Sequence, residues 1–287
     1  MAKKKNRSAA SRRAEHPDKT GAVAGVYPIS TGEAKLVPDG YHADGWLLLI
    51  NGVQSSHVIV GQPRMLDFEY MRWIAAVLDS HIQTHLNPEK LRITHLGGGA
   101  CSLARYCADV YPNSRNTVVE LDAKLAEYVR DWFDIPKSPR VKIRVGDAGT
   151  VTRSFAPASR DVVIRDVFAV DKTPAELTGV DFVRTVDHSL APGGLYILNC
   201  GDDRALNAAR AEATALLEVF EYVSIVADSA MLKGRRRGNI ILAGSHAPLP
   251  QLGSAEAASI SRVLMGGGVP AQYWDTEKVR VFARKGV

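Results

Sequence analysis

The 287-residue sequence is poor in cysteine, with only Cys101, Cys107 and Cys200, and no Cys-x-x-Cys pair occurs. This spacing argues against a disulfide framework and predicts no metal site. No stretch approaches the run of about 18 apolar residues that a membrane-spanning helix needs. The basic N-terminus also lacks the apolar core of a secretory signal. These absences predict a cytoplasmic protein with reduced thiols and no membrane partner.

Outside the N-terminus, the sequence also has no excess of positive or negative charge. The formal net charge is +5, and residues 1–20 alone carry seven Lys/Arg and two acids. The remaining 29 basic and 29 acidic residues balance. A neutral body gives no reason to expect a nucleic-acid partner. Residues 1–24 contain no core-forming run, so we expect a disordered, solvated basic tail.

Short apolar runs rich in β-branched residues alternate with helical patterns from residue 91 onward. This alternation predicts an α/β fold with a mostly parallel sheet and helices on both faces. Two expected helices fit the same scheme. One is alanine-rich, at 203–219, and the other, at 173–190, has Pro174 in its first turn. Strands are expected at 91–96, 116–121, 140–145, 161–168, 192–200, 221–227 and 238–244.

Before this region, two apolar runs flank Asn51-Gly52, the dipeptide best suited to a tight hairpin turn. An amphipathic helix is expected at 67–82. The chain is therefore expected to divide into four parts. They are the tail at 1–24, a small N-terminal β domain at 25–62, a Rossmann-like domain at 63–250, and an extension at 251–287 that is either a strand or an arm.

The stretch LRITHLGGGACSLARYCAD, residues 91–109, places three glycines between an expected strand and an expected helix. In open α/β sheets, ligands bind at the carboxyl ends of strands where the strand order reverses. Glycine permits close contact because a Cβ would block the approach and because such a turn can require a positive φ. Gly97, Gly98 and Gly99 are therefore candidate ligand-binding residues, although a glycine triplet alone also suits a tight turn.

Carboxylates follow at the ends of the next three expected strands. Glu120 lies 23 residues after Gly97, where an acid accepts hydrogen bonds from ribose hydroxyls. Asp147 can accept a hydrogen bond from an adenine amine, and Asp166 ends the fourth strand. Each acid alone also suits a helix cap or a solvated loop. The three in register predict one crevice that binds a nucleoside.

The glycine loop favours an adenosyl sulfonium over a dinucleotide. It does not spell Gly-x-Gly-x-x-Gly, because Ser102 stands where the last glycine would be. Acids at strand ends would repel a diphosphate, whereas they attract a cationic sulfonium. The stretch LAPGGLYIL at 190–198 is also a pattern familiar from adenosylmethionine-dependent transferases.

Over about residues 45–245, the sequence contains these motifs in order: LLLINGVQSS, DFEYMRW, ITHLGGGACSLARY, VVELD, VKIRVGDA, DVVIRDVFA, LAPGGLYILN and GNIILAGS. This ordered set resembles that of the polyamine aminopropyltransferases, the spermidine synthases. The resemblance is strongest to divergent bacterial spermidine-synthase-like proteins. It implies a β-hairpin domain before a methyltransferase-like Rossmann domain, and a homodimer or homotetramer. It also implies transfer of an aminopropyl group from decarboxylated S-adenosylmethionine, the co-substrate, to a small-molecule amine, with release of methylthioadenosine and no metal.

The resemblance also implies roles for individual residues. Asp166 matches the catalytic acid/base, which would accept or orient the amine proton. Tyr70 and Gln54 match residues near the acceptor amine. The positions that match the donor site are Gly97, Gly98, Gly99, Glu120, Asp147 and Ala148.

Four positions depart from the family pattern. Ala100 replaces an Asp that holds the donor's ammonium group, Ala169 replaces the second Asp after the fourth strand, Met71 replaces His or Gln, and Asn51 replaces the hairpin Asp. Burying a dicationic amine requires paired carboxylates. Two alternatives therefore stay open: methyl transfer from S-adenosylmethionine itself, and a nucleoside-binding homologue without catalysis.

Three other side chains are candidates for reactive groups. His57 and His95 are possible bases, but His95 lies in a core strand and is expected to be packed. Cys101 has no His or Asp partner placed by the sequence, so an inert thiol is expected.

Overall fold

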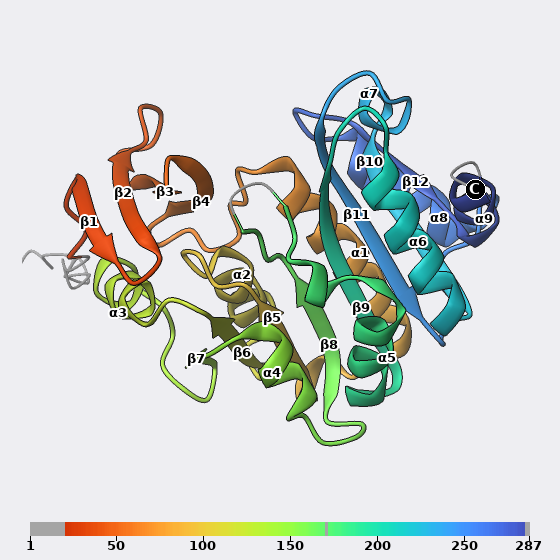
Figure 1. The fold of residues 1–287 in the computed structure, drawn as a ribbon, viewed down its shortest axis with the longest axis horizontal. Helices are drawn as coiled ribbons and strands as arrows, with labels where there is room; N and C mark the ends of the chain where they lie inside the picture. Colours follow the sequence, from red (N-terminus) through yellow and green to blue (C-terminus); the bar gives the residue numbers. More distant parts are fainter. Residues whose placement is uncertain (1–20, 170–171, 285–287) are drawn as a thin grey trace, which may run out of the picture.

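The computed structural model describes residues 21–169 and 172–284, and it has an α/β fold with two sheets (Figure 1). Residues 1–20 of the expected basic tail lie outside the described residues. The N-terminal sheet is an antiparallel meander in which each strand pairs with the next. Asn51 and Gly52 form its last turn with φ of 50° and 80°, as the hairpin motif predicts. Its strands are β1 (Gly25–Ile29), β2 (Gly32–Pro38), β3 (Gly45–Ile50) and β4 (Val53–Ile59).

Within the described residues, the second sheet contains eight strands in the order β12-β10-β11-β9-β8-β5-β6-β7. All pairings from β7 to β9 are parallel, whereas β10 and β11 join the sheet antiparallel, as does β12. The predicted mostly parallel α/β sheet is thereby confirmed. Its strands are β5 (Arg92–Leu96), β6 (Arg115–Glu120), β7 (Val141–Val145), β8 (Arg160–Arg165), β9 (Leu190–Asp202), β10 (Tyr222–Asp228), β11 (Gly238–Ser245) and β12 (Ala271–Trp274).

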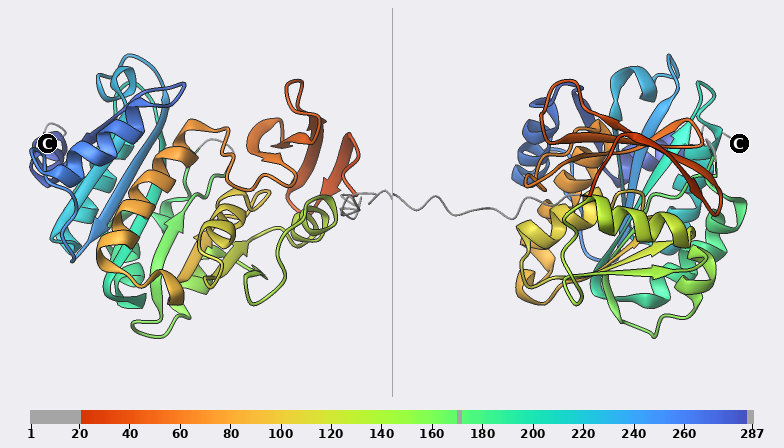
Figure 2. Two further views of the ribbon diagram at one scale, coloured as in Figure 1. Left: turned by 180° about the vertical axis from the view of Figure 1, so that it is seen from behind. Right: turned by 90° about the vertical axis from the view of Figure 1, so that its left-hand side faces the viewer.

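Helices cover both faces of this sheet. In Figure 1, α4, α5 and α6 lie in front of the sheet, and the view from behind in Figure 2 shows α1 and α8 on the opposite face. The helices are α1 (Glu69–His85), α2 (Ser102–Val110), α3 (Ala123–Trp132), α4 (Ala148–Arg153), α5 (Gly179–Ser189), α6 (Asn207–Val219), α7 (Ser229–Leu232), α8 (Ala255–Met265) and α9 (Thr276–Arg284), with 3-10 turns η1 (Pro88–Lys90) and η2 (Ala175–Leu177). In the part of the chain that the structure describes, none of these helices is long and apolar enough to cross a membrane.

The central strands are buried on both faces, which explains their continuous apolar sequences. Val162 and Val163 of β8 are fully buried, and so are Leu195, Tyr196 and Ile197 of β9. These residues belong to one large core cluster that also contains side chains of α1, α5 and α6. The core thus fixes the strands whose carboxyl ends carry the candidate site.

Two segments differ from the expected pattern. Residues 173–190 form the η2 turn and α5 rather than one helix, because Gly179 adopts φ +78°, which a continuous helix does not allow. Pro174 is extended and precedes η2. Beyond residue 250, the chain forms α8, β12 and α9, and β12 pairs with β10 at the edge of the large sheet.

The N-terminal sheet packs against the β7 side of the molecule, above α2 and α3 (Figure 1). Tyr27 of β1 contacts Trp132 of α3, with ring centroids 4.8 Å apart. The backbone N–H of Thr31 donates to Asp122 Oδ2 over 2.6 Å, at the start of α3. These contacts place the turns of the small sheet over the carboxyl edge of the large one.

Candidate active site

A cavity of about 1140 Å³ lies between the turns of the N-terminal sheet and the carboxyl edge of the large sheet. Strand order reverses at β5, which has β6 on one side and β8 on the other. Ligands of open α/β sheets bind at such a reversal. The cavity is lined by every predicted site residue, namely Gln54, Tyr70, Gly97, Gly98, Gly99, Glu120, Asp147, Ala148 and Asp166.

The glycine loop after β5 lies so close to its neighbours that side chains do not fit. Gly97 has φ +92°, and a Cβ there would lie 2.1 Å from the Asp166 carbonyl oxygen. Gly99 has φ +46°, and its Cβ would lie 2.5 Å from Ser56 Oγ on β4. Glycine is therefore required both for the backbone conformation and for the approach of the loop to β8 and β4.

Glu120, at the end of β6, holds this loop. Its Oε2 accepts hydrogen bonds from the backbone N–H groups of Gly98 (3.0 Å) and Gly99 (3.2 Å). Its Oε1 accepts one from the N–H of Asp122 over 2.9 Å. Burial raises the pKa of Glu120, and these backbone donors oppose the rise. Since a carboxylate oxygen has two lone pairs, Oε1 retains one for a ligand hydroxyl.

Asp147, after β7, caps a helix in addition to lining the cavity. Its Oδ1 accepts a hydrogen bond from the backbone N–H of Thr150 over 2.7 Å, at the first turn of α4. That hydrogen bond is the main reason why the pKa of Asp147 is lowered. Ala148 follows as the first residue of the helix and is buried. Asp147 therefore caps α4, as one of the two interpretations of its sequence position predicts, and it also lines the cavity.

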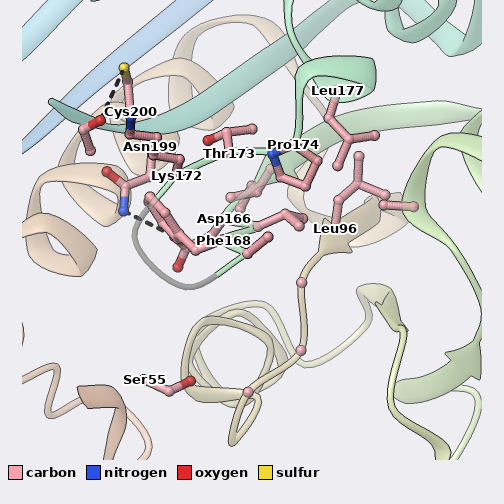
Figure 3. Close-up of a pocket in the computed structure, with 18 of the residues that line it drawn as sticks. Ser55, Leu96, Asp166, Phe168, Lys172, Thr173, Pro174, Leu177, Asn199 and Cys200 are labelled. Carbon is pink, nitrogen blue, oxygen red and sulfur yellow. Dashed lines mark hydrogen bonds between the residues drawn. The ribbon is translucent and has the colours of Figure 1, made fainter. Parts of the chain in front are cut away.

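Asp166, after β8, is held by two side chains from distant parts of the chain. Tyr70 of α1 donates from its hydroxyl to Oδ2 over 3.0 Å. Asn199 of β9 donates from Nδ2 to Oδ1 over 2.9 Å, drawn as a dashed line in Figure 3. Burial raises the pKa of Asp166, while the Asn199 and Tyr70 hydrogen bonds and the nearby Arg165 charge oppose the rise. Each oxygen keeps one lone pair, so the carboxylate can still accept a proton.

Tyr70 remains protonated in this arrangement. Burial, followed by the charge of Asp166 and the hydrogen bond to it, raises the pKa of Tyr70 well above its ordinary value. A protonated phenol is the donor that a carboxylate needs. Tyr70 and Asp166, which lie 96 residues apart in sequence, are thus brought into direct contact.

Asn199 was not predicted as a site residue. The signal was weak but present: Asn199 is a polar residue in the otherwise apolar stretch GLYILNC. It lies on β9 beside β8, close to the end at which Asp166 stands. A buried polar side chain at a strand end next to a candidate catalytic acid is the pattern that would have found it.

Only three of the four positions that depart from the family pattern line the cavity. Asn51, Met71 and Ala169 do so, whereas Ala100 does not. Ala100 is fully buried, and its N–H donates to Ser56 Oγ over 3.0 Å. The residue therefore belongs to the contact between the glycine loop and β4, and its side chain takes no part in the cavity wall.

Acidic residues dominate the wall of the cavity. Among the described residues that line it, eight are acidic and two are basic. The basic residues are Lys172 and Arg237, and the acidic ones are Glu120, Asp122, Asp147, Asp166, Glu176, Asp202, Asp203 and Glu212. Glu212 is compensated, because its Oε1 lies 2.6 Å from Nη2 of the buried Arg165. The remaining excess of acidic over basic residues attracts cationic ligands.

Two other reactive groups at the wall are held in unreactive states. His95 Nε2 lies 3.0 Å from Asn116 Oδ1, and burial lowers the pKa of His95 to about 4. Burial raises the pKa of Cys101 to about 12, so this thiol is not ionised at neutral pH. Neither residue is suited to act as base or nucleophile.

The fold and the cavity together define a Rossmann-like domain of the methyltransferase type, in which the cavity lies under an N-terminal β-sheet. A crystal structure of a probable spermidine synthase from Corynebacterium glutamicum is 58% identical in sequence, with a TM-score of 0.89 over 91% of this chain and 94% of that one. The chain belongs to the spermidine synthase family, as the motifs predict. No family model matches the sequence.

Curated relatives match shorter regions. The eEF1A lysine and N-terminal methyltransferase of Mus musculus is 33% identical over 128 residues, which are 41% of this chain and 18% of that protein. The polyamine aminopropyltransferase of Vibrio vulnificus is 26% identical over 140 residues, 48% of this chain and 45% of that enzyme. The matched region thus spans less than half of either relative.

Proposed function

We propose that the protein transfers an aminopropyl group from decarboxylated S-adenosylmethionine to a small amine and releases methylthioadenosine. The observation that carries this proposal is the composition of the cavity wall, which includes eight acidic residues and two basic ones among the residues described. Donor and acceptor are both cationic in this reaction, so such a wall attracts both. Membership in the spermidine synthase family supports the same reaction.

The donor end of the cavity suits an adenosyl group. Glu120 offers a lone pair on Oε1 to a ribose hydroxyl, and Asp147 is a candidate acceptor for the adenine amine. Gly97, Gly98 and Gly99 allow the loop to approach the donor, and Ala148 lies beside Asp147. These roles follow from the family resemblance and from the shared cavity.

The chemical step is a direct displacement at carbon. The lone pair of a neutral amine attacks the carbon next to the sulfonium, the carbon–sulfur bond breaks, and its electron pair stays on sulfur in methylthioadenosine. The new ammonium group then loses a proton. Asp166 is the proposed acceptor of that proton, with Tyr70 holding the carboxylate and Gln54 beside the amine. The protein's task is alignment and proton transfer, since the sulfonium is already activated.

Methyl transfer from S-adenosylmethionine is the second candidate. It is favoured by Ala100, which replaces the family's acid for the donor's ammonium group, and by the relationship to eEF1A methyltransferases. A donor that keeps its own carboxylate has less need of a carboxylate in the protein. The two candidates share the nucleoside site and differ in the donor and in the atom that is attacked.

Ligand binding and product analysis separate the candidates. Thermal unfolding is measured with decarboxylated S-adenosylmethionine, S-adenosylmethionine, methylthioadenosine and S-adenosylhomocysteine. A ligand at 100 times its dissociation constant adds about 2.7 kcal/mol to the unfolding free energy. Products formed with a panel of linear diamines are then identified by mass spectrometry.

Aminopropyl transfer predicts the larger stabilisation by the decarboxylated donor and release of methylthioadenosine. Preference for the carboxylated donor, with release of S-adenosylhomocysteine, would overturn it in favour of methyl transfer. Stabilisation by methylthioadenosine without turnover of either donor would instead indicate a binding protein.

We further propose that the protein acts as a homodimer or homotetramer in the cytoplasm. The family resemblance supports the oligomer. The three cysteines, all free and buried, are compatible with a reducing compartment. Light scattering coupled to gel filtration measures the oligomeric state, and a monomeric mass would contradict the proposal.

A further inference from the structure

Three side chains with metal-binding atoms converge outside the cavity, in the N-terminal sheet. Asp39 Oδ2 lies 2.6 Å from His42 Nδ1 and 3.1 Å from His57 Nε2. The three candidate ligand atoms all lie within 4.8 Å of one another. Asp39 and His42 belong to the loop between β2 and β3, whereas His57 lies on β4. None of the three lines the cavity described above.

The loop that carries Asp39 and His42 is tightly built. The N–H of Asp39 donates to the Gly45 carbonyl over 2.7 Å, and the N–H of Gly45 donates to the His42 carbonyl over 2.9 Å. A Cβ at Gly45 would lie 2.6 Å from Asp39 Cβ, so the loop closes only because residue 45 is glycine. Tyr41 donates its N–H to Asp39 Oδ1 over 2.9 Å, which orients the carboxylate and leaves Oδ2 toward the two imidazoles.

This set of atoms matches the ligand preference of a divalent transition metal. Zinc binds imidazole nitrogen and carboxylate oxygen at about 2.0–2.2 Å, so ligand atoms of a tetrahedral site lie about 3.3 Å apart. The distances from Asp39 Oδ2 to His42 Nδ1 and His57 Nε2, 2.6 and 3.1 Å, are shorter than this value, so small side-chain rotations that widen them would bring the atoms to coordination distances. The side chains of His57 and Asp39 are 7% and 10% exposed, whereas that of His42 is 41% exposed, which leaves a route for an ion and a water ligand.

We infer that Asp39, His42 and His57 form a binding site for a divalent transition-metal ion such as Zn²⁺. The coordination consists of the two imidazoles and one carboxylate, with the fourth position open to water. The sequence alone predicts no metal site because its three cysteines are scattered. The ligands here are two histidines and an aspartate that become neighbours only when β4 packs beside the 39–45 loop.

The proposed metal site adjoins the contact between β4 and the glycine loop. Ser102 Oγ, at the start of α2, donates to the His57 carbonyl over 2.9 Å. The preceding residue on β4, Ser56, accepts from the N–H of Ala100 over 3.0 Å. A metal ion that fixes His57 to the 39–45 loop therefore holds β4 in the position at which it contacts the glycine loop. The assigned role is structural, since the ligands lie outside the reaction cavity.

Titration calorimetry with ZnCl₂ tests the site, on the full chain without a histidine tag and after removal of metals by a chelator. The variants are His42→Ala, which changes a half-exposed side chain, and Asp39→Asn, which keeps the shape of the residue. His246→Ala is the matched control, because His246 Nε2 lies 3.0 Å from Asp187 Oδ1 and the described residues place no third candidate ligand beside them. Cobalt absorption spectra of the same proteins report the coordination geometry.

The inference predicts uptake of one Zn²⁺ per chain, weakened at least about tenfold in His42→Ala and Asp39→Asn and unchanged in His246→Ala. No stoichiometric uptake by the unmodified chain, or equal uptake by His42→Ala, would overturn it. Anomalous diffraction at the zinc edge adds a position that does not depend on how the variants fold. A peak between the three side chains supports the site, and a peak only elsewhere refutes it. Neither readout depends on turnover, so this test stands apart from that of the proposed reaction.

Discussion

The two ends of the cavity are built in different ways. At the proposed donor end, the two carboxylates are held by backbone N–H groups: Glu120 by those of Gly98 and Asp122, and Asp147 by that of Thr150. At the acceptor end, Asp166 is held by the side chains of Tyr70 and Asn199, which are 96 and 33 residues away. The proposed donor end is therefore held mainly by the main chain, whereas the proposed acceptor end is held by side chains.

This difference predicts different consequences of mutation. A backbone donor remains when neighbouring side chains change, so the donor end tolerates sequence variation around its acids. The acceptor end depends on each side chain that contacts Asp166.

The largest expected effect is that of Asp166→Asn. If Asp166 accepts the amine proton, its loss lowers kcat by about 10²–10⁴-fold, the usual contribution of a general base. Donor affinity should stay within a few-fold because the proposed donor contacts lie at the other end of the cavity. Steady-state kinetics and donor calorimetry measure the two quantities. Undiminished turnover would remove Asp166 from the mechanism.

The acceptor end also rests on a buried ion pair, Arg165 with Glu212, whose side chains are 0% and 4% exposed. Arg165 also donates to the carbonyl of Leu177, in the segment that follows Asp166 in the chain. Removing one partner leaves a buried charge, so Arg165→Met should lower the free energy of unfolding by about 3–5 kcal/mol. Chemical denaturation measures this loss.

Arg64→Met is the control for that prediction. The Arg64–Asp109 pair has the same nitrogen–oxygen distance, 2.6 Å, but its side chains are 67% and 41% exposed. An exposed pair contributes about 0–1 kcal/mol. Equal losses in the two variants would show that burial does not decide the stability contributed by Arg165.

Most of the large sheet, and the meeting of the candidate donor residues at one cavity, could be predicted from the sequence for a physical reason. Apolar runs, glycines and strand-end acids are local signals, and parallel strands bring their carboxyl ends to one edge. Gly97, Glu120 and Asp147 therefore reach one cavity through regular geometry. The 173–190 helix was predicted wrongly because the helical pattern of its side chains does not reveal the positive φ at Gly179.

The contacts of the acceptor end and of the N-terminal sheet could not be predicted in the same way. Asn199 reaches Asp166 through the pairing of β8 with β9, and Arg165 finds Glu212 on α6, 47 residues further along the chain. The cluster at Asp39 depends on the packing of a loop beside β4. Such long-range pairs follow from tertiary packing, for which a single sequence carries no periodic signal.

A smaller effect is expected at the donor end. Glu120→Ala removes the acceptor for two loop N–H groups and for the proposed ribose hydroxyl. A lost buried hydrogen bond costs about 1–3 kcal/mol. The binding free energy of the donor should therefore become weaker by that amount, as measured by calorimetry. Glu127→Ala, on the exposed side of α3, should leave affinity unchanged. Unaltered affinity in Glu120→Ala would contradict the ribose assignment.

The smallest effect, a shift in pH dependence, is expected for Tyr70→Phe. Burial raises the pKa of Asp166, and the Tyr70 hydroxyl opposes that rise by donating to the ionised form. Loss of the hydroxyl therefore raises the pKa further. A reaction that requires the carboxylate is active above this pKa, so the acid limb of the kcat profile should move to higher pH. The plateau at alkaline pH should change only a few-fold, because Asp166 is ionised there in both proteins.

Tyr111→Phe provides the matched comparison for this profile. Tyr111 is as buried as Tyr70 and donates to a carboxylate, Asp79 Oδ1, over 2.7 Å, outside the cavity. Its loss should leave the acid limb in place. The same linkage acts on stability: a carboxyl whose pKa is raised by folding stabilises the fold less as pH rises from the ordinary value toward the raised one. Both variants remove a hydroxyl donor from a carboxyl whose pKa is raised by burial, Asp166 in one and Asp79 in the other, so both should lose stability relative to the unmodified protein as the pH increases through that interval. Only Tyr70→Phe should move the acid limb of the kcat profile, and a coincident acid limb in both variants would separate Tyr70 from the ionisation of Asp166.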